Sequence, residues 1–326
     1  FKVKPNAPKR NSPLEKNDHP EIDVSEFLGE DDTLLYQSLI GSMQWAITLG
    51  RFDVNAAVMT MSSFRSQPRK GHLERVKQMI GYLSKFKHFK IRFRTEEPDY
   101  SNFHDNHHDW SDTVYRNPTE DKPKDAPEPL GKSVTITSHF DANLMHDILS
   151  GKACTGILHF LNKTPLDWYC KKQSISETAT YSVKYCACRT CIEQIIGLRN
   201  TLRYLGVNLN DKTYVFGDNE SMINSSTIPH ARLHKRHNIL SYHYVRSMIA
   251  SGFLNMQHIP SEFNAADILS KNWGYQSAWK NTLQPIFNWA GDVGDLVEQD
   301  PWYVQVSNLV TQLNDGEYCK FQQTIL

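Results

Sequence analysis

Residues 133–172 decide the fold, and they read SVTITSHFDANLMHDILSGKACTGILHFLNKTPLDWYCKK. Within this stretch, the pattern of residue types has a period of two in three short runs, which are 134–138, 153–160 and 166–170. Turn residues separate the runs. A period of two is typical of β-strands, and consecutive strands joined by short turns pair as an antiparallel meander. We therefore expect three antiparallel strands here.

After these strands the apolar residues recur at three- and four-residue steps. They predict a long helix from about Val183 to Leu205, with Gly206 as its stop. Strands and helices then alternate, over about 213–217 (strand), 233–250 (helix), 253–259 (strand) and from about 264 (helix). The order βββαβαβ followed by a helix predicts an α/β fold with a mixed sheet, hairpins first and right-handed crossovers later.

The charge is unevenly distributed, although the 326 residues carry 36 basic and 36 acidic side chains. A net charge of zero excludes a uniformly basic nucleic-acid coat but allows local basic surfaces. We divide the chain at its composition shifts into an acidic lead-in (1–32, net −3), a helical basic block (33–95, +9), an acidic linker with five prolines (96–130, −7), the α/β part (131–275, +5) and a C-terminal extension of unknown role (276–326, −4).

Other features of the sequence limit the class of protein. No run approaches the roughly 20 apolar residues of a membrane span, so we expect no membrane partner. The start lacks Met and a signal-peptide core, so we expect a piece of a longer protein. The six cysteines follow no disulfide-scaffold spacing. We expect reduced thiols, as in the cytosol or nucleus.

Three aspartates lie at the ends of predicted elements. Asp141 follows the first strand, Asp218 ends the fourth and Asp267 opens the last helix. In an α/β sheet, strand carboxyl ends and the following helix starts converge on one crevice. Clustered carboxylates suit hard cations such as Mg²⁺, so these aspartates are candidate metal ligands.

Short motifs around these aspartates occur in the order and spacing of a known family. They are Tyr36 to Met43, Arg51 to Val54, Lys70 to Leu73, Lys171 to Gln173, Gly217 to Ser221, His234 to His237 and His258 to Pro260. On them, residues 33–275 resemble the C-terminal region of the Pol polyprotein of copia-type LTR retrotransposons, which is the reverse-transcriptase thumb/connection followed by ribonuclease H.

The resemblance implies a ribonuclease H-like fold that hydrolyses the RNA strand of an RNA–DNA hybrid. Four carboxylates would hold two Mg²⁺ (or Mn²⁺) ions, and Asp141, Asp218 and Asp267 match three of them. The implied partners are the hybrid and the rest of the Pol polyprotein, in the cytoplasm or nucleus and within a virus-like particle. We expect nucleic-acid contacts from basic and polar residues near the crevice: Lys171, Lys172, Gln173, Asn219, Arg232, Lys235 and Arg236.

The fourth carboxylate is missing, because Lys184 stands at the position of the family's glutamate. An ammonium group has three donors and no lone pair for a metal. At about 4 Å and an effective dielectric near 20, it attracts each neighbouring aspartate by roughly 4 kcal/mol before desolvation. Lys184 can therefore hold the crevice together without metal. Glu177, before the helix, and Glu220, after Asp218, are alternative carboxylate donors.

Two functions remain open: a ribonuclease H-like enzyme impaired by Lys184, and a catalytically inactive, domesticated module that binds nucleic acid or protein. Other candidate groups have simpler interpretations. We expect Cys186, Cys188 and Cys191 to be small buried residues of the long helix, and His258 to be a packed or edge histidine. The aromatic residues of the helical block are predicted to lie in its core: Tyr36, Trp45 and Tyr82.

Overall fold

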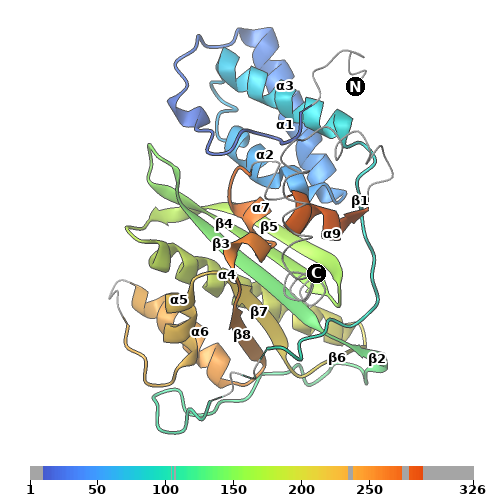
Figure 1. The fold of residues 1–326 in the computed structure, drawn as a ribbon, viewed down its shortest axis with the longest axis vertical. Coiled ribbons are helices and arrows are strands. Elements are labelled where there is room, and N and C mark those ends of the chain that lie inside the picture. The colour runs from blue at the N-terminus through green and yellow to red at the C-terminus, as the bar shows by residue number, and fades with distance from the viewer. Residues whose placement is uncertain (1–9, 104, 106–107, 234–237, 274–278, 289–326) are drawn as a thin grey trace, which may run out of the picture.

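The computed structural model describes residues 10–103, 105, 108–233, 238–273 and 279–288. A group of helices lies above a mixed sheet that has its own covering helices (Figure 1). The helical group contains α1 (Glu30–Thr48), α2 (Asn55–Ser62) and α3 (Lys70–Lys85), with a 3-10 turn, η2 (Phe52–Val54), before α2. The basic block, which was expected to be helical, therefore contains three α-helices in its described residues.

One aromatic residue of this block was predicted wrongly. Tyr36 and Tyr82 are fully buried, but Trp45 is 65% exposed. The buried side of α1 is formed by residues such as Ile40, Met43 and Ile47, and Trp45 lies on its other side. Helical spacing showed that Trp45 lies on a helix but not which side faces the core.

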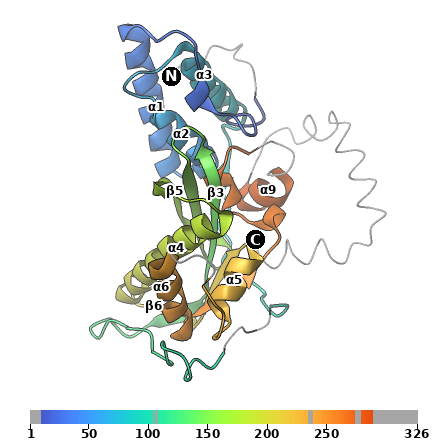
Figure 2. The ribbon, with the colours of Figure 1, turned by 90° about the vertical axis from the view of Figure 1, so that its left-hand side faces the viewer.

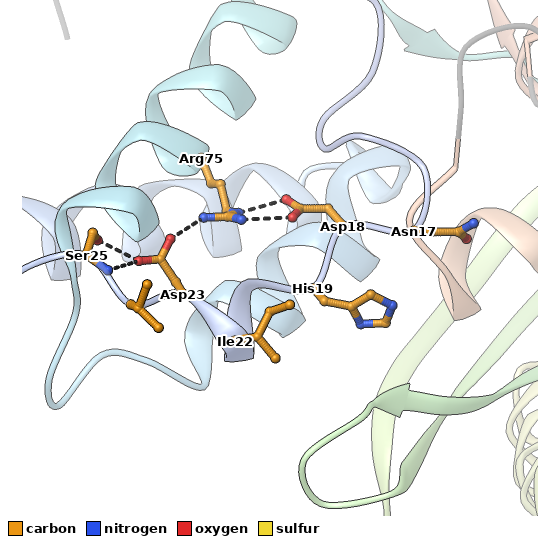
Figure 3. A pocket seen from close by; sticks show the side chains of 8 residues that line it. Asn17, Asp18, His19, Ile22, Asp23, Ser25 and Arg75 are labelled. Atoms are coloured by element: carbon orange, nitrogen blue, oxygen red, sulfur yellow. Dashed lines mark hydrogen bonds and ion pairs between the residues drawn. The ribbon is translucent and has the colours of Figure 1, made fainter.

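The lead-in packs against α3. Arg75 of α3 donates to both carboxylate oxygens of Asp18, at 2.8 and 2.9 Å, and to Asp23 at 2.7 Å (Figure 3). The 3-10 turn η1 (Pro20–Ile22) lies between them, and Leu14 is buried. Part of the positive charge of the basic block is thus neutralised within the chain. Since α1 begins at Glu30, the boundary predicted at residue 32 falls inside its first turn.

The acidic stretch 96–130 follows β1 (Lys90–Ile91) and runs along the sheet to its lower end (Figure 1). It is fixed at two places. Trp110 is buried, with the guanidinium of Arg246 4.8 Å from its ring centre. Glu120 pairs with Arg199 and Arg203, both at 2.7 Å. Its composition indicated a linker, but two buried contacts hold it against the α/β part.

The main sheet confirms the predicted α/β class with a mixed sheet. Its strand order is β5-β4-β3-β7-β8. The pairs β3–β4 and β4–β5 are antiparallel, and β3–β7 and β7–β8 are parallel. The strands are β3 (Ile136–Asp147), β4 (Lys152–Leu161), β5 (Thr164–Ser176), β7 (Thr213–Gly217) and β8 (Leu254–His258). Hairpins come first and crossovers later, as expected.

Helices cover both faces of this sheet (Figure 2). The neighbouring residues Ile157 and Leu158 of β4 point to opposite faces and belong to separate cores. Ile157 lies in the core of α4 (Thr180–Tyr204) and α6 (Ile239–Ala250). Leu158 lies in the core shared with α7 (Asp267–Ser270) and the helical group.

Smaller elements complete the described chain. A parallel pair is formed by β2 (Leu130–Val134) and β6 (Val207–Leu209), and β1 pairs with β9 (Phe287–Asn288). The remaining elements are α5 (Glu220–Thr227), η4 (Ser261–Phe263), the π-helical turn η5 (Trp279–Leu283) and α9 (Gln284–Ile286). The separate helix α5 was not predicted. Its first residue follows Asn219, whose side chain accepts a hydrogen bond from Met222 N at 2.9 Å and so caps the helix.

Candidate active site

The crevice lies where two central strands diverge. Pairing between β3 and β7 ends at His139 and Phe216, and Asp141 and Asp218 follow two residues later on each chain segment. Asp141 lies inside β3 rather than after it, so the predicted strand end at residue 138 was wrong. Polar residues such as His139 and Asp141 obscured the strand, although both are fully buried.

Three aspartates meet at this point. Oxygen atoms of Asp141, Asp218 and Asp267 all lie within 4.8 Å of one another. They come from β3, the end of β7 and the first residue of α7, as expected of a crevice at strand and helix ends. The side chains of Asp141 and Asp218 are 2% and 6% exposed, and that of Asp267 is 23% exposed.

Lys184 lies among these carboxylates. It belongs to the first turns of α4, and its ammonium nitrogen lies 2.9 Å from Oδ1 of Asp141 and donates to Oδ1 of Asp218. Burial alone would lower the pKa of Lys184, but the two aspartates outweigh burial and raise it. Lys184 is therefore a buried cation that bridges two of the three aspartates.

A second lysine, which the sequence interpretation missed, completes the cluster. Nζ of Lys271 lies 2.8 Å from Oδ2 of Asp267 and 3.7 Å from Oδ2 of Asp141. Asp267 and Lys271 are four residues apart, a spacing at which opposite charges meet on a helix, so the signal was present in the sequence. Ser270 donates to Asp141, and Ser261 donates to Oδ2 of Asp218 at 2.7 Å.

The pKa values of Asp141 and Asp267 are shifted in opposite directions. Burial alone would raise the pKa of Asp141, but Lys184 and Lys271 together with the Ser270 hydrogen bond hold it well below its usual range. The pKa of Asp267 lies well above its usual value of 3.8, because it is buried beside Asp141 and Lys271 offsets this only in part. The crevice thus holds three acidic and two basic groups.

The cluster fits a divalent cation only in part. Three convergent carboxylates are ligands that hard cations prefer. However, Oδ1 of Asp141 and Oδ1 of Asp218 already contact the ammonium of Lys184, which has no lone pair and carries a positive charge. The residues present therefore do not fit two metal ions held by four carboxylates.

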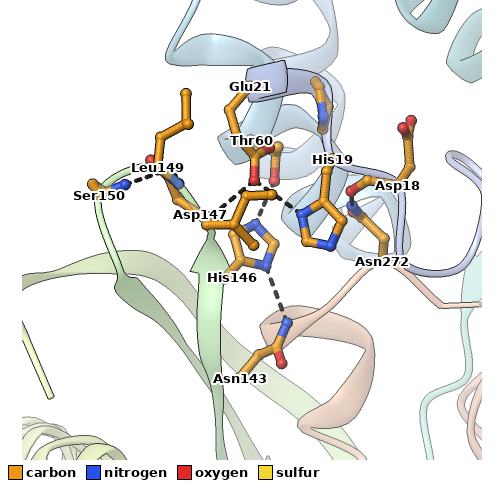
Figure 4. A network of polar contacts seen from close by, with 12 residues as sticks. Asp18, His19, Glu21, Thr60, Asn143, His146, Asp147, Leu149, Ser150 and Asn272 are labelled. Atoms are coloured by element: carbon orange, nitrogen blue, oxygen red, sulfur yellow. Dashed lines mark hydrogen bonds and ion pairs between the residues drawn. The ribbon is translucent and has the colours of Figure 1, made fainter. Parts of the chain in front are cut away.

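The lead-in borders the crevice. A cavity of about 140 Å³ beside Asp267 and Lys271 is also lined by Lys16 and Asn17. Asp18 accepts from Asn272 through its backbone carbonyl at 3.2 Å (Figure 4). Nearby, Nε2 of His146 on β3 lies 2.7 Å from Oγ1 of Thr60 on α2. The helical group and the sheet therefore meet next to the aspartates.

No protein-family model matches the chain, but curated proteins do. Over 239 residues, or 72% of this chain, it is 28% identical to the retrovirus-related Pol polyprotein from transposon TNT 1-94 of Nicotiana tabacum. Over 242 residues it is 21% identical to those from transposons RE1 and RE2 of Arabidopsis thaliana. This chain is similar to copia-type Pol polyproteins over most of its length. It spans 14–15% of the length of these relatives.

Solved structures give a weaker likeness. LC11-RNase H1 in complex with RNA/DNA hybrid is 19% identical, with a TM-score of 0.34, over 42% of this chain and 94% of that one. Foamy viral protease-reverse transcriptase in complex with RNA/DNA hybrid is 11% identical, with a TM-score of 0.32, over 48% and 22%. The five-stranded mixed sheet of this chain, with hairpins first and parallel crossovers later, has the element order that the sequence predicted.

The residues expected to contact nucleic acid differ in whether their side chains are exposed or already paired within the chain. Lys171, Lys172 and Gln173 lie inside β5 rather than at a strand exit, because β5 continues to Ser176. Lys171 is exposed, whereas Lys172 pairs with Asp147 at 2.7 Å. Gln173 donates at 3.0 Å to Oγ1 of Thr155 and to the carbonyl of Val183.

The remaining expected contacts follow β7. Asn219 caps α5, and Arg232 is exposed. Lys235 and Arg236 lie outside the described residues. Exposure therefore leaves Lys171 and Arg232 most accessible to a phosphate backbone among the described candidates.

The alternative carboxylate donors do not join the cluster. Among the described residues, the acidic group that comes together at the crevice consists of the three aspartates, without Glu177 or Glu220. Glu220 is exposed at the start of α5. Cys188 and Cys191 are buried in α4, and His258 is exposed at the end of β8. With neither glutamate in the cluster, Lys184 is the residue that contacts both Asp141 and Asp218.

Proposed function

We propose that this chain is the ribonuclease H-like region of a copia-type Pol polyprotein, preceded by its thumb/connection-like helices. In this proposal, it binds RNA–DNA hybrid, cleaves it poorly or not at all, and acts beside the rest of the polyprotein in the cytoplasm or nucleus, within a virus-like particle. The divisions at residues 32, 95, 130 and 275 are part of the proposal. The buried bridge from Lys184 to Asp141 and Asp218 carries it.

The charges at the crevice oppose metal binding more than they oppose contact with phosphate groups. Binding of Mg²⁺ or Mn²⁺ would require Lys184 to leave its two aspartates or to lose a proton, and both aspartates raise its pKa. Cation binding is therefore weakened. Phosphate contacts do not need the metal, because exposed cations such as Lys171 and Arg232 can make them directly. Binding and cleavage are thus separable here.

Cleavage and binding of one labelled RNA–DNA hybrid test this function. We expect the unaltered chain to bind the hybrid and to cut it on the order of 100-fold more slowly than Lys184→Glu, a difference of about 3 kcal/mol in activation free energy. Both proteins are assayed with Mg²⁺ and with Mn²⁺. Adding Asp218→Asn to Lys184→Glu provides the matched control, which should bind without cutting.

Three results would overturn parts of this proposal. Metal-dependent cutting by the unaltered chain that Asp218→Asn abolishes would show that three carboxylates suffice for catalysis. Absence of hybrid binding would remove the nucleic-acid function and leave a module that binds protein. If Lys184→Glu binds the hybrid but does not cut it, then residue 184 is not the cause of the weak cleavage.

A further inference from the structure

Two thiols lie side by side on neighbouring strands of the sheet. The Sγ atoms of Cys154 on β4 and Cys170 on β5 are 3.6 Å apart. In the antiparallel register, Cys154 lies opposite Lys172 and Cys170 lies opposite Gly156. Residues two apart on a strand share a face, so both thiols project from the same face at diagonal positions.

The two sulfurs lie beneath the backbone of α7. Gly156, directly opposite Cys170, has no side chain, and the backbone of α7 occupies that space, with the carbonyl oxygen of Ala266 2.7 Å from where a Cβ would lie. Cys154 is fully buried, with its Sγ 3.8 Å from the carbonyl oxygen of Leu269. Cys170 is only half-buried, on β5 at the edge of the sheet.

We propose that Cys154 and Cys170 form a reversible intramolecular disulfide beneath α7 when the protein meets a peroxide. A disulfide has an S–S length of about 2.05 Å, so the sulfurs must approach by roughly 1.5 Å. This site is independent of the proposed hybrid binding.

The reaction balances with hydrogen peroxide as the oxidant. The half-buried Cys170 sulfur attacks one peroxide oxygen, the O–O bond breaks, and a sulfenic acid and one water form. Sγ of Cys154 then attacks the Cys170 sulfur. Its S–H proton leaves with the hydroxyl group as a second water, and the S–S bond forms. Two thiols lose two electrons in total, and one peroxide molecule is reduced to two waters.

The location links this disulfide to the crevice. Asp141, Gly156 and Cys170 lie in one row across β3, β4 and β5. Sγ of Cys154, which would enter the bond, lies 3.8 Å from the carbonyl oxygen of Leu269 in α7, the helix that carries Asp267. The thiol pair and the aspartates therefore border the same short helix on the same face.

Peptide mapping of the folded chain tests the pair directly. The chain is treated with hydrogen peroxide, its remaining thiols are blocked with iodoacetamide, and it is digested with trypsin without reductant. We expect the peptide 153–163 joined to the peptide 164–171, with the mass of two hydrogens lost, and separate peptides after reduction. Circular dichroism before digestion verifies that the treated chain is folded.

Matched variants distinguish this pair from general thiol oxidation. Cys170→Ser should abolish the joined peptide, whereas Cys188→Ala, which removes a buried thiol of α4, should leave its yield unchanged. The proposal fails if peroxide gives only unlinked sulfenic or sulfinic products at Cys170 in a folded chain. It also fails if Cys154 or Cys170 joins another cysteine instead of its neighbour.

Discussion

At the scale of single residues, Lys184 places a cation at the centre of an acidic cluster. Its ammonium contacts Asp141 and Asp218, and Lys271 contacts Asp267. Each lysine therefore stabilises a buried negative charge that a metal ion would otherwise neutralise. The sequence predicted the pairing of Lys184 with the aspartates. It did not predict Lys271, although Lys271 is four residues from Asp267, a spacing at which opposite charges meet on a helix.

Removing the charge of Lys184 should destabilise the fold. In Lys184→Met, Asp141 and Asp218 lose their buried counter-charge, and we expect a loss of about 3 kcal/mol in unfolding free energy at pH 7. Urea unfolding in EDTA measures it. Lys171→Met, at an exposed position of β5, is the control and should change stability by less than about 0.5 kcal/mol. Equal losses in both variants would remove the structural role of Lys184.

At the scale of elements, the close packing of α7 on β4 fixes Asp267 in place. Gly156→Ala would bring a Cβ to 2.7 Å from backbone atoms of α7, so we expect a loss of about 1–3 kcal/mol. Gly197→Ala, in an exposed part of α4 where a Cβ meets nothing within 4 Å, should stabilise the chain by up to about 1 kcal/mol. Chemical denaturation of both variants tests this contrast, and stabilisation by Gly156→Ala would contradict it.

The acidic stretch 96–130 should contribute stability that depends on pH. Burial opposes the charge of Glu120, but Arg199 and Arg203 outweigh burial and lower its pKa. A lowered carboxyl pKa stabilises the fold above the unfolded value, near 4.5, and this stability is lost as pH falls through the folded value. Glu120→Gln should therefore reduce stability by about 3 kcal/mol at pH 7 and by progressively less below pH 4.5. Urea unfolding at several pH values measures this difference, and a constant gap down to pH 3 would contradict it.

The sequence identified most elements but not all of their lengths. Alternation located β3, β4 and β5, yet β3 and β5 continue well beyond the predicted ends. Both contain polar residues that strand patterns do not favour, such as Asp141 and Gln173. These side chains are tolerated because partners in other parts of the chain, such as Lys184 and Val183, hold them. Such long-range partners are not visible in a local pattern.

At the scale of the whole molecule, the helical group and the sheet share one core. Phe52 of η2 stacks on Trp168 of β5 at 4.8 Å and lies 4.9 Å from Phe287 of β9. Trp273, just after α7, donates to the carbonyl of Asp53 at 3.2 Å. Charge and composition divided the chain into segments, but they could not show this shared packing.

Among the described residues, no helix has the length and apolar character needed to cross a membrane.

Because this core is shared, the two parts should unfold together. Phe52→Ala removes a fully buried ring, and we expect a loss of about 3–5 kcal/mol. Far-ultraviolet circular dichroism reports mainly the helices, and tryptophan fluorescence includes Trp168 on the sheet. Both signals should shift to lower denaturant by the same amount. A shift in one signal alone would show that the two parts unfold independently.

The most direct test of the account is the response of thermal stability to Mg²⁺. A ligand that binds the folded chain raises its melting temperature in proportion to RT ln(1 + [L]/Kd). Melting temperatures are measured by differential scanning calorimetry in EDTA and in increasing Mg²⁺, for the unaltered chain, Lys184→Glu and Lys184→Glu with Asp218→Asn. We predict no shift for the unaltered chain, a rise of several degrees for Lys184→Glu and its loss in the double variant. A Mg²⁺-dependent rise in the unaltered chain that Asp218→Asn abolishes would contradict the claim that Lys184 takes the place of a metal.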